Sequence, residues 1–171
     1  MGETIAVITT GGTIGSLISG RTVSVDPNGA AVLAEISRLS ERHGFDVTVD
    51  AALNKHSEDL VPEDWVSIAR LVRTKISDGV RRIVITHGTD TMEYTAAACA
   101  LLFGASDVRI CLTGAYLPLE ASNSDGPLNL IAAFRAVASD DLPTGVYAAF
   151  RQDSENSRAR IIPALALKAM A

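Results

Sequence analysis

Two threonines follow glycines in short loops, and each offers a hydroxyl group that could do chemistry. Thr13 stands in the stretch TTGGTIGS, and Thr89 stands in the stretch HGTDT beside Asp90. A threonine hydroxyl can attack a carbonyl carbon when a base removes its proton and N–H donors stabilise the oxyanion that forms. A single threonine in such a loop is more simply explained as a helix cap or a turn residue. Two matching loops favour a site built on hydroxyl groups.

Both loops come directly after runs of β-branched residues, and such runs recur along the chain. They predict five strands, at residues 4–9, 45–53, 81–86, 107–113 and 145–150. Apolar residues at i, i+3 and i+4 spacing predict four helices between them, at residues 30–43, 62–78, 92–103 and 127–138. Alternating strands and helices are satisfied by parallel strands with right-handed crossovers. The sequence therefore predicts a single α/β domain with a doubly wound (Rossmann-like) parallel sheet and helices on both faces.

The polar loops of this predicted sheet all lie at one edge. The loops TGGTIGS, NKHSED, HGTDT and GAYLPLEASNSDG follow the first four strands, whereas the turns at the opposite strand ends are short and plain. In open parallel sheets, ligands bind at the carboxyl ends of the strands, where helix N-termini point N–H groups at the crevice. We expect the functional site at this edge.

Other kinds of site that this edge could carry lack their residue patterns. The stretch GGTIG (11–15) lacks the GxGxxG spacing of a dinucleotide site, and the chain has no P-loop pattern. His43, His56 and His87 are scattered, so no metal site is predicted. The sequence has neither a Gly-x-Ser-x-Gly elbow nor a cysteine in one of these loops. We therefore expect no metal ion and no cofactor.

The charge and hydropathy of the chain limit the kinds of partner that it could bind. The formal net charge is -5 and no Lys/Arg-rich run occurs, which argues against nucleic acid as a partner. No apolar run approaches the roughly 18 to 20 residues that span a bilayer, and the N-terminus does not resemble a signal peptide. We expect a cytoplasmic protein that acts on a small molecule. Cys99 and Cys111 have neither metal-ligand spacing nor the density of a disulfide scaffold, so we interpret both as buried hydrophobic residues.

The C-terminal tail, residues 151–171, differs from the predicted domain of residues 1–150. Its first part, RQDSENSRAR, is polar, and its second part, IIPALALKAMA, is apolar but interrupted by Pro163. An exposed apolar tail of this kind needs a partner surface. We expect it to pack on the domain or on another subunit.

Three longer segments carry a family resemblance. Together, TTGGTIGS, VITHGTDTMEYTA and LTGAYLPLEASNSDGPLNL resemble the L-asparaginase family of threonine-dependent amidohydrolases, in the same order and spacing over about the first 150 residues. The motifs PEDW and TGAYLPL are more similar to the cytoplasmic type I members. The resemblance implies hydrolysis of L-asparagine to L-aspartate and ammonia through an acyl-enzyme, with glutamine as a side substrate and no cofactor.

The resemblance also implies a role for each residue of the site. Thr13 would be the nucleophile, and Thr89 would be the second catalytic threonine, which assists proton transfer together with Asp90. Asp90 would also bind the α-ammonium group of the substrate. Ser57 and Glu58 would hold the α-carboxylate side and the ammonium. The implied substrate-binding set is Ser57, Glu58, Asp90, Gly12 and Gly88.

Three features depart from the family pattern. Ile162 stands where the resemblance implies a catalytic lysine, and Lys168 could serve instead only if the tail folds back. The loop after Thr13 lacks the family's tyrosine, which makes Tyr116 an auxiliary candidate. The family's usual C-terminal domain is not part of this chain, which we expect to be a short form that works as a homo-oligomer.

Three functions follow from these observations. The first is a short-form asparaginase with an open site. The second is a non-catalytic or very slow module that binds asparagine or aspartate but has lost efficient proton transfer. The third is an amidase component that supplies ammonia to a partner enzyme, as in tRNA-linked amidotransferases; the absence of a basic patch gives it little support.

Overall fold

Six strands form the central sheet of the computed structural model, which describes residues 4–19, 22–26, 29–151 and 158–168. In spatial order they are β4 (Val47–Lys55), β1 (Ile5–Gly11), β5 (Arg82–Thr86), β6 (Arg109–Thr113), β7 (Gly145–Phe150) and β8 (Arg160–Pro163). The first five strands run parallel, and β8 pairs antiparallel with β7. The five predicted strands are thus the parallel part of the sheet.

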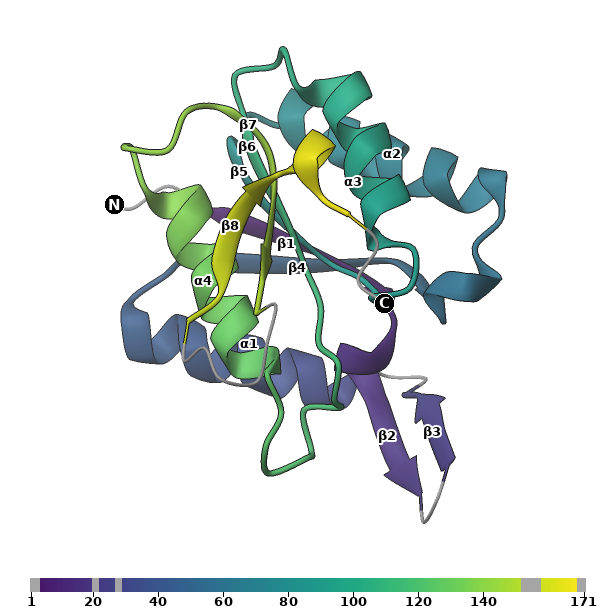
Figure 1. Cartoon of the computed structure of the whole chain (residues 1–171). Coiled ribbons are helices and arrows are strands. Elements are labelled where there is room, and N and C mark those ends of the chain that lie inside the picture. Colours follow the sequence, from purple (N-terminus) through teal and green to yellow (C-terminus); the bar gives the residue numbers. More distant parts are fainter. Residues whose placement is uncertain (1–3, 20–21, 27–28, 152–157, 169–171) are drawn as a thin grey trace.

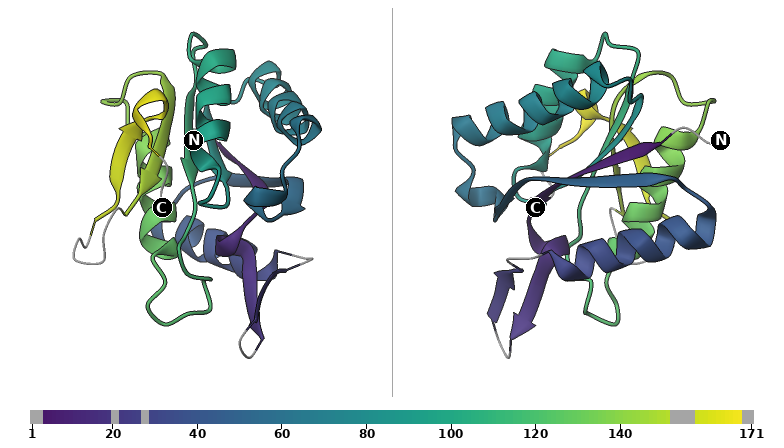
Figure 2. Two further views of the ribbon diagram at one scale, coloured as in Figure 1. Left: turned by 45° about the vertical axis from the view of Figure 1, so that its right-hand side comes forward. Right: turned by 180° about the vertical axis from the view of Figure 1, so that it is seen from behind.

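Two helices cover each face of the sheet, as Figures 1 and 2 show. One face carries α1 (Ala30–His43) and α4 (Gly126–Ala138), and the other carries α2 (Pro62–Ser77) and α3 (Met92–Phe103). Within α1, Val32, Ile36 and Leu39 form one buried stripe at helical spacing, which seats this helix on the sheet. The predicted doubly wound α/β fold is confirmed.

The core consists of two apolar layers, one on each face of the sheet. Along β1, Ile5 and Val7 pack in the layer under α1 and α4, while Ala6 and Ile8 pack in the layer under α2 and α3. All four side chains are buried, because successive residues of a strand point to opposite faces. This double burial explains why the parallel strands read as continuous apolar runs and not as alternating ones.

The connections reverse direction between β1 and β5. Helix α1 connects β1 to its neighbour β4. Helix α2, on the other face of the sheet, then connects β4 to β5, which pairs with the opposite side of β1. At such a switch point the loops after the two strands separate to opposite faces and leave a crevice at the carboxyl edge. The loops that carry Thr13 and Thr89 follow these two strands.

Several elements were not predicted from the sequence. A hairpin of β2 (Ser16–Ser19) and β3 (Thr22–Val25) follows the first loop, and β8 is an additional edge strand. Three short 3-10 turns are η1 (Thr13–Gly15), η2 (Ser57–Asp59) and η3 (Ala164–Ala166). Among the described residues, no helix is long and apolar enough to cross a membrane.

Part of the C-terminal tail packs on the domain. Strand β8 joins the sheet, and Ala164 in η3 is buried in the apolar layer that also contains α2 and α3. Leu167 packs against the same layer. Residues 152–157 and 169–171 of the tail lie outside the described part of the chain.

Candidate functional site

The first two loops of the site touch through their glycines. Gly12 has a φ of 78°, and a Cβ atom built on it would lie 2.5 Å from the Cα of Gly88 and against the Gly88 nitrogen. The Gly12 N–H donates to the carbonyl oxygen of Lys55 at 2.9 Å, at the end of β4. Glycine is therefore required at position 12, because only a residue without a side chain allows the loop after β1 to reach the loop after β5.

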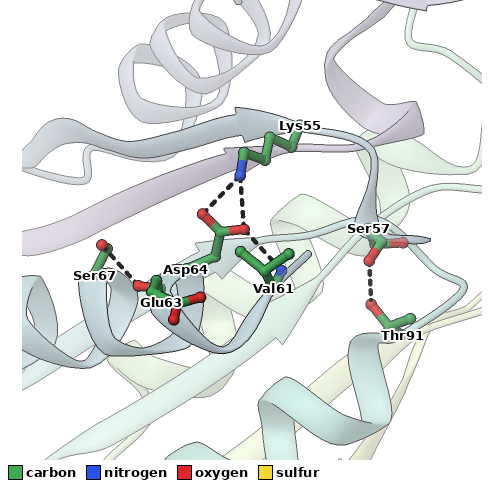
Figure 3. Close-up of polar contacts among 7 residues, drawn as sticks. All are labelled: Lys55, Ser57, Val61, Glu63, Asp64, Ser67 and Thr91. Atoms are coloured by element: carbon green, nitrogen blue, oxygen red, sulfur yellow. Dashed lines mark hydrogen bonds and ion pairs between the residues drawn. The ribbon is translucent and has the colours of Figure 1, made fainter. Parts of the chain in front are cut away.

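Ser57 brings the loop after β4 to the same point. A Cβ atom on Gly88 would lie 2.5 Å from the Oγ atom of Ser57, and the Thr91 hydroxyl donates to the Ser57 carbonyl oxygen at 2.9 Å. Figure 3 shows Ser57 and Thr91 facing each other across the two loops. The side-chain oxygen of Ser57 is buried and has no hydrogen-bond partner among the described residues. Because buried polar groups are nearly always paired, this hydroxyl is suited to a ligand.

Thr13 begins the turn η1 and is partly exposed. The carbonyl oxygen of Gly12 accepts from the Gly15 N–H at 3.1 Å and from the Ser16 hydroxyl at 2.9 Å, which fixes the backbone on both sides of Thr13. The hairpin then returns to the same turn, where the Asp26 N–H donates to the Gly15 carbonyl oxygen at 3.0 Å. The Thr13 hydroxyl is thus presented by a turn that is held at both ends.

The other predicted site residues flank these contacts. Thr89 is 6% exposed, whereas the carboxyl groups of Asp90 and Glu58 belong to exposed residues. Thr89 directly follows Gly88 and Glu58 directly follows Ser57, and Gly88 and Ser57 each contact another loop. The structure therefore brings together the loops after β1, β4 and β5, which carry the hydroxyl residues Thr13, Ser57 and Thr89 and the exposed residues Glu58 and Asp90.

Tyr116 lies in the loop after β6, and that loop is held by a network missed in the sequence. The buried Asp125 carboxylate accepts from the backbone N–H groups of Tyr116 and Leu117, and from the side-chain amide of Asn129 at 2.8 Å. The Tyr116 ring lies edge-on to Phe150 at 4.8 Å. Burial, and secondly the charge of Asp125, raise the pKa of Tyr116. The signal that could have revealed the network is the i, i+4 pair of Asp125 and Asn129 at the start of a helix.

Ile162 stands where the resemblance implies a lysine, and the structure shows where the basic residues on either side of it lie. Ile162 lies inside β8 opposite Ala148, and the strand starts with Arg160, opposite Phe150 at the carboxyl end of β7. Lys168 is exposed and follows η3, which packs against α3. Arginine remains charged at any physiological pH and is a poor proton acceptor. The role of Lys168 remains a prediction.

Lys55 stands at the end of β4 but is engaged elsewhere. Its ammonium group donates to both carboxylate oxygens of Asp64, at 2.9 and 2.8 Å, as Figure 3 shows. One of these oxygens also accepts from the Val61 N–H at 2.9 Å. These hydrogen bonds hold the pKa of Asp64 below its ordinary value, and the bond from Lys55 has the largest effect. The pair closes the loop of residues 55–64, which carries Ser57 and Glu58.

A pH-dependent loss of stability is expected from Asp64→Asn. The folded-state pKa of Asp64 is lower than the unfolded value of 3.8, so its contribution is complete above pH 3.8 and is lost as the pH falls through the folded-state pKa. The difference in unfolding free energy from the wild type should be about 1 kcal/mol at pH 7, because Lys55 is 42% exposed, and should shrink toward zero in acid. Urea unfolding between pH 7 and pH 2.5 measures it. Glu35→Gln, which breaks an exposed pair with Arg38, is the matched control; equal losses at pH 7 would contradict the assignment.

Three cavities of the molecule are lined by residues other than Thr13, Ser57 and Thr89. A cavity of about 210 Å³ lies behind the first loop and is lined by Gly11, Gly15 and Thr86 among others. Larger grooves of about 620 and 520 Å³ lie between α4 and β8 and between α2 and α3, and neither is lined by Gly12, Gly88 or Ser57. No cluster of three or more potential metal ligands occurs among the described residues. The predicted site residues Thr13, Ser57 and Thr89 do not line either of the two larger grooves.

The chain is similar in sequence to known proteins over most of its length. Residues 4–168 match the family model described as "Asparaginase, N-terminal". One subunit of the glutamyl-tRNA(Gln) amidotransferase of Methanococcus vannielii is 36% identical over 153 residues, which are 85% of this chain and 33% of that protein. The same component of the Methanobrevibacter smithii enzyme is 38% identical over 140 residues, which are 81% and 31%.

Solved structures agree. L-asparaginase I from Vibrio cholerae superposes with a TM-score of 0.79 at 30% identity, over 96% of this chain and 47% of that one. The probable cytoplasmic L-asparaginase from Campylobacter jejuni gives 0.77 at 30% identity, over 95% and 46%. The chain thus spans about a third of these curated relatives and about half of these solved chains. The resemblance predicted from the threonine loops is confirmed: the chain belongs to the asparaginase family and has the fold of its N-terminal domain.

Proposed function

We propose that this chain hydrolyses the side-chain amide of L-asparagine, with Thr13 as the nucleophile. The observation that carries the proposal is the contact of the three loops at Gly12, Gly88 and Ser57, because it gathers the hydroxyl-bearing loops at the switch point of the sheet. Attack by the Thr13 hydroxyl on the amide carbon releases ammonia and leaves an ester of Thr13. Water then attacks the ester, frees L-aspartate and restores the hydroxyl.

Backbone N–H groups would stabilise the oxyanion of the two tetrahedral intermediates. The Thr89 N–H has no hydrogen-bond acceptor within the described part of the chain, and it follows directly on the glycine that the first loop contacts. Donors fixed before the reaction are worth several kcal/mol, since they need no reorganisation as charge develops. Thr89 would assist proton transfer beside Asp90, and Tyr116 and Lys168 are auxiliary candidates. A missing general base costs about 10²- to 10⁴-fold, which predicts a slow enzyme and not an inert one.

The polar groups of the three loops suit an amino acid. The buried, unpartnered Ser57 hydroxyl could donate to the α-carboxylate, while Asp90 and Glu58 offer negative charge to the α-ammonium group. Neither a metal ion nor a cofactor has a part in this mechanism. We also propose a cytoplasmic homo-oligomer, a proposal supported by the described similarity to a probable cytoplasmic L-asparaginase.

Asp90→Ala should weaken the binding of L-aspartate, the product, by roughly 10- to 100-fold. The reason is that a charge-assisted hydrogen bond contributes about 1.5 to 3 kcal/mol. Isothermal titration calorimetry at constant ionic strength measures the change. Asp107→Ala, which removes a carboxylate just before β6 at the opposite edge of the sheet, is the control of equal charge. Equal affinities for the two variants would remove Asp90 from the ammonium site.

A second candidate is the hydrolysis of glutamine to supply ammonia. It is favoured by the curated relatives, which are named as subunits of a glutamyl-tRNA(Gln) amidotransferase. The predicted lack of a basic patch does not oppose an amidase component whose partner binds the nucleic acid. Ammonia release from L-asparagine and L-glutamine, measured side by side on the purified chain, tests both candidates. Faster release from glutamine would replace the asparaginase proposal, and binding of aspartate without any release would favour the non-catalytic module.

A further inference from the structure

We propose that Trp65, Thr95 and His87 form a buried hydrogen-bond relay that fixes the orientation of the Gly88–Thr89 peptide, so that His87 is a positioning residue for Thr89. The inference deepens the proposed function and rests on it. His87 was expected at most as a metal ligand, a role that the scattered histidines did not support. The structure offers a different use for its two ring nitrogens.

The relay consists of three hydrogen bonds of equal length. The Trp65 indole nitrogen donates to the Thr95 hydroxyl at 2.8 Å. That hydroxyl lies 2.8 Å from Nε2 of His87, and Nδ1 of His87 lies 2.8 Å from the carbonyl oxygen of Gly88. The relay thus leads from α2 through α3 to the loop after β5.

The partners determine the tautomer of His87. A carbonyl oxygen only accepts, so Nδ1 must carry the proton that it shares with Gly88. Nε2 of a neutral ring is then an acceptor for the Thr95 hydroxyl, whose own lone pair accepts from Trp65. His87 is fully buried, and this burial lowers its pKa, which keeps the ring neutral. Every donor and acceptor of the relay is therefore matched in one arrangement.

The bond to Gly88 sets the direction of the next N–H group. The Gly88–Thr89 peptide is trans, and in a trans peptide the C=O and the following N–H point in opposite directions. When the Gly88 carbonyl is held against the His87 ring, the Thr89 N–H must point away from it. This N–H is the one that we assign to the oxyanion.

Contacts on the other side leave this peptide little freedom to adjust. A Cβ atom built on Gly12 would overlap the backbone of Gly88, and a Cβ atom built on Gly88 would overlap the side chain of Ser57. A rotation of the peptide away from His87 would therefore move against the two other loops of the site. An error of about 1 Å in such a site can cost about 10²-fold in rate.

The test compares two buried threonines that each lose one hydroxyl. Thr95→Val breaks the relay, whereas Thr113→Val removes a hydroxyl that donates to the Ala149 carbonyl oxygen on a neighbouring strand, outside the relay. Thr113 is as buried as Thr95, but its hydroxyl has one hydrogen-bond partner and that of Thr95 has two, so Thr95→Val should cost more stability, and kcat is compared under conditions in which both variants are fully folded. We expect kcat to fall about 10- to 100-fold in Thr95→Val, with KM changed less than threefold, and both to stay within threefold in Thr113→Val. Thr95→Ser, which keeps the hydroxyl, should restore kcat.

Equal falls of kcat in the two valine variants would overturn the inference, and so would an unchanged kcat in Thr95→Val. If Thr95→Val does not fold, Trp65→Phe carries the same test from the partly exposed end of the relay, with an expected fall of about 3- to 10-fold in kcat.

An NMR measurement separates this inference from the proposed function. In the wild type, the ¹⁵N spectrum of the His87 ring should show the proton on Nδ1, and Thr95→Val, but not Thr113→Val, should shift the Thr89 amide signal. If the wild type releases no ammonia from either amide, the proposed function fails, and these spectra alone decide the relay. A proton on Nε2, or a Thr89 signal that does not respond to Thr95→Val, would overturn it.

Discussion

The Thr13→Ala variant is expected to release ammonia from L-asparagine at least about 10³-fold more slowly than the wild type, because removal of a nucleophile leaves only binding and oxyanion stabilisation. Thr13 is partly exposed and lies in a turn that is held by the backbone of Gly12 and by Ser16. The loss of its side chain should therefore change the free energy of unfolding by less than about 0.5 kcal/mol. A coupled ammonia assay and urea unfolding, on the same preparations, give the two values.

Thr13→Ser is the matched variant, since it keeps a hydroxyl at the same position. We expect it to retain measurable turnover, and we expect Thr13→Ala to bind L-aspartate as the wild type does. Undiminished turnover in a folded Thr13→Ala would remove Thr13 as the nucleophile. Thr89 would then be the hydroxyl to test, because it lies on the other side of the Gly12 and Gly88 contact.

The second large effect is expected from Gly12→Ala. The alanine would have to adopt a φ of 78°, which costs about 1 to 3 kcal/mol, and its Cβ would overlap the backbone of Gly88. Backbone cannot give way as a flexible side chain can, so the loop after β1 must move away from the loop after β5. We expect a loss of more than about 3 kcal/mol in unfolding free energy, and the loss of turnover with it.

Gly44→Ala is the control that has the backbone strain of a positive φ without a steric overlap. Gly44 ends α1 with a φ of 70°, and a Cβ atom built on it meets nothing within 4 Å. Its loss of stability should be about 1 kcal/mol, without effect on turnover. The two variants are compared by urea unfolding at pH 7. Equal losses would mean that the contact between Gly12 and Gly88 does not hold the two loops together.

Local patterns were enough to predict the parallel part of the fold. The helices α1 and α3 have the bounds expected from apolar spacing, and Gly44 closes α1 in the left-handed conformation that glycine favours. The hairpin of β2 and β3 was missed because its strands have four residues each and pair only with one another. Strand β8 was missed since a proline normally argues against a strand; Pro163 is accommodated at its end, on the edge of the sheet.

The sequence predicted that the site lies at the carboxyl edge of the sheet, but it did not predict the contacts between the loops there. Parallel strands bring their carboxyl ends together, so the position of the loops of Thr13, Ser57 and Thr89 follows from the order of the elements. That Gly88 contacts both Gly12 and Ser57 depends on the tertiary approach of three loops, which no local pattern encodes. The partners of His87 are also tertiary, because Thr95 and Trp65 lie on two different helices.

The two buried thiols allow unfolding of the chain to be followed by their chemical labelling. Cys99 and Cys111 are both buried, and burial raises the pKa of Cys99 to about 12 and that of Cys111 further still. Only thiolates react rapidly with alkylating reagents, so the native chain should be silent toward iodoacetamide, while any molecule that opens its core becomes labelled at up to two positions. The rate of mass gain in a mass spectrometer then measures how often each variant opens, without an added probe.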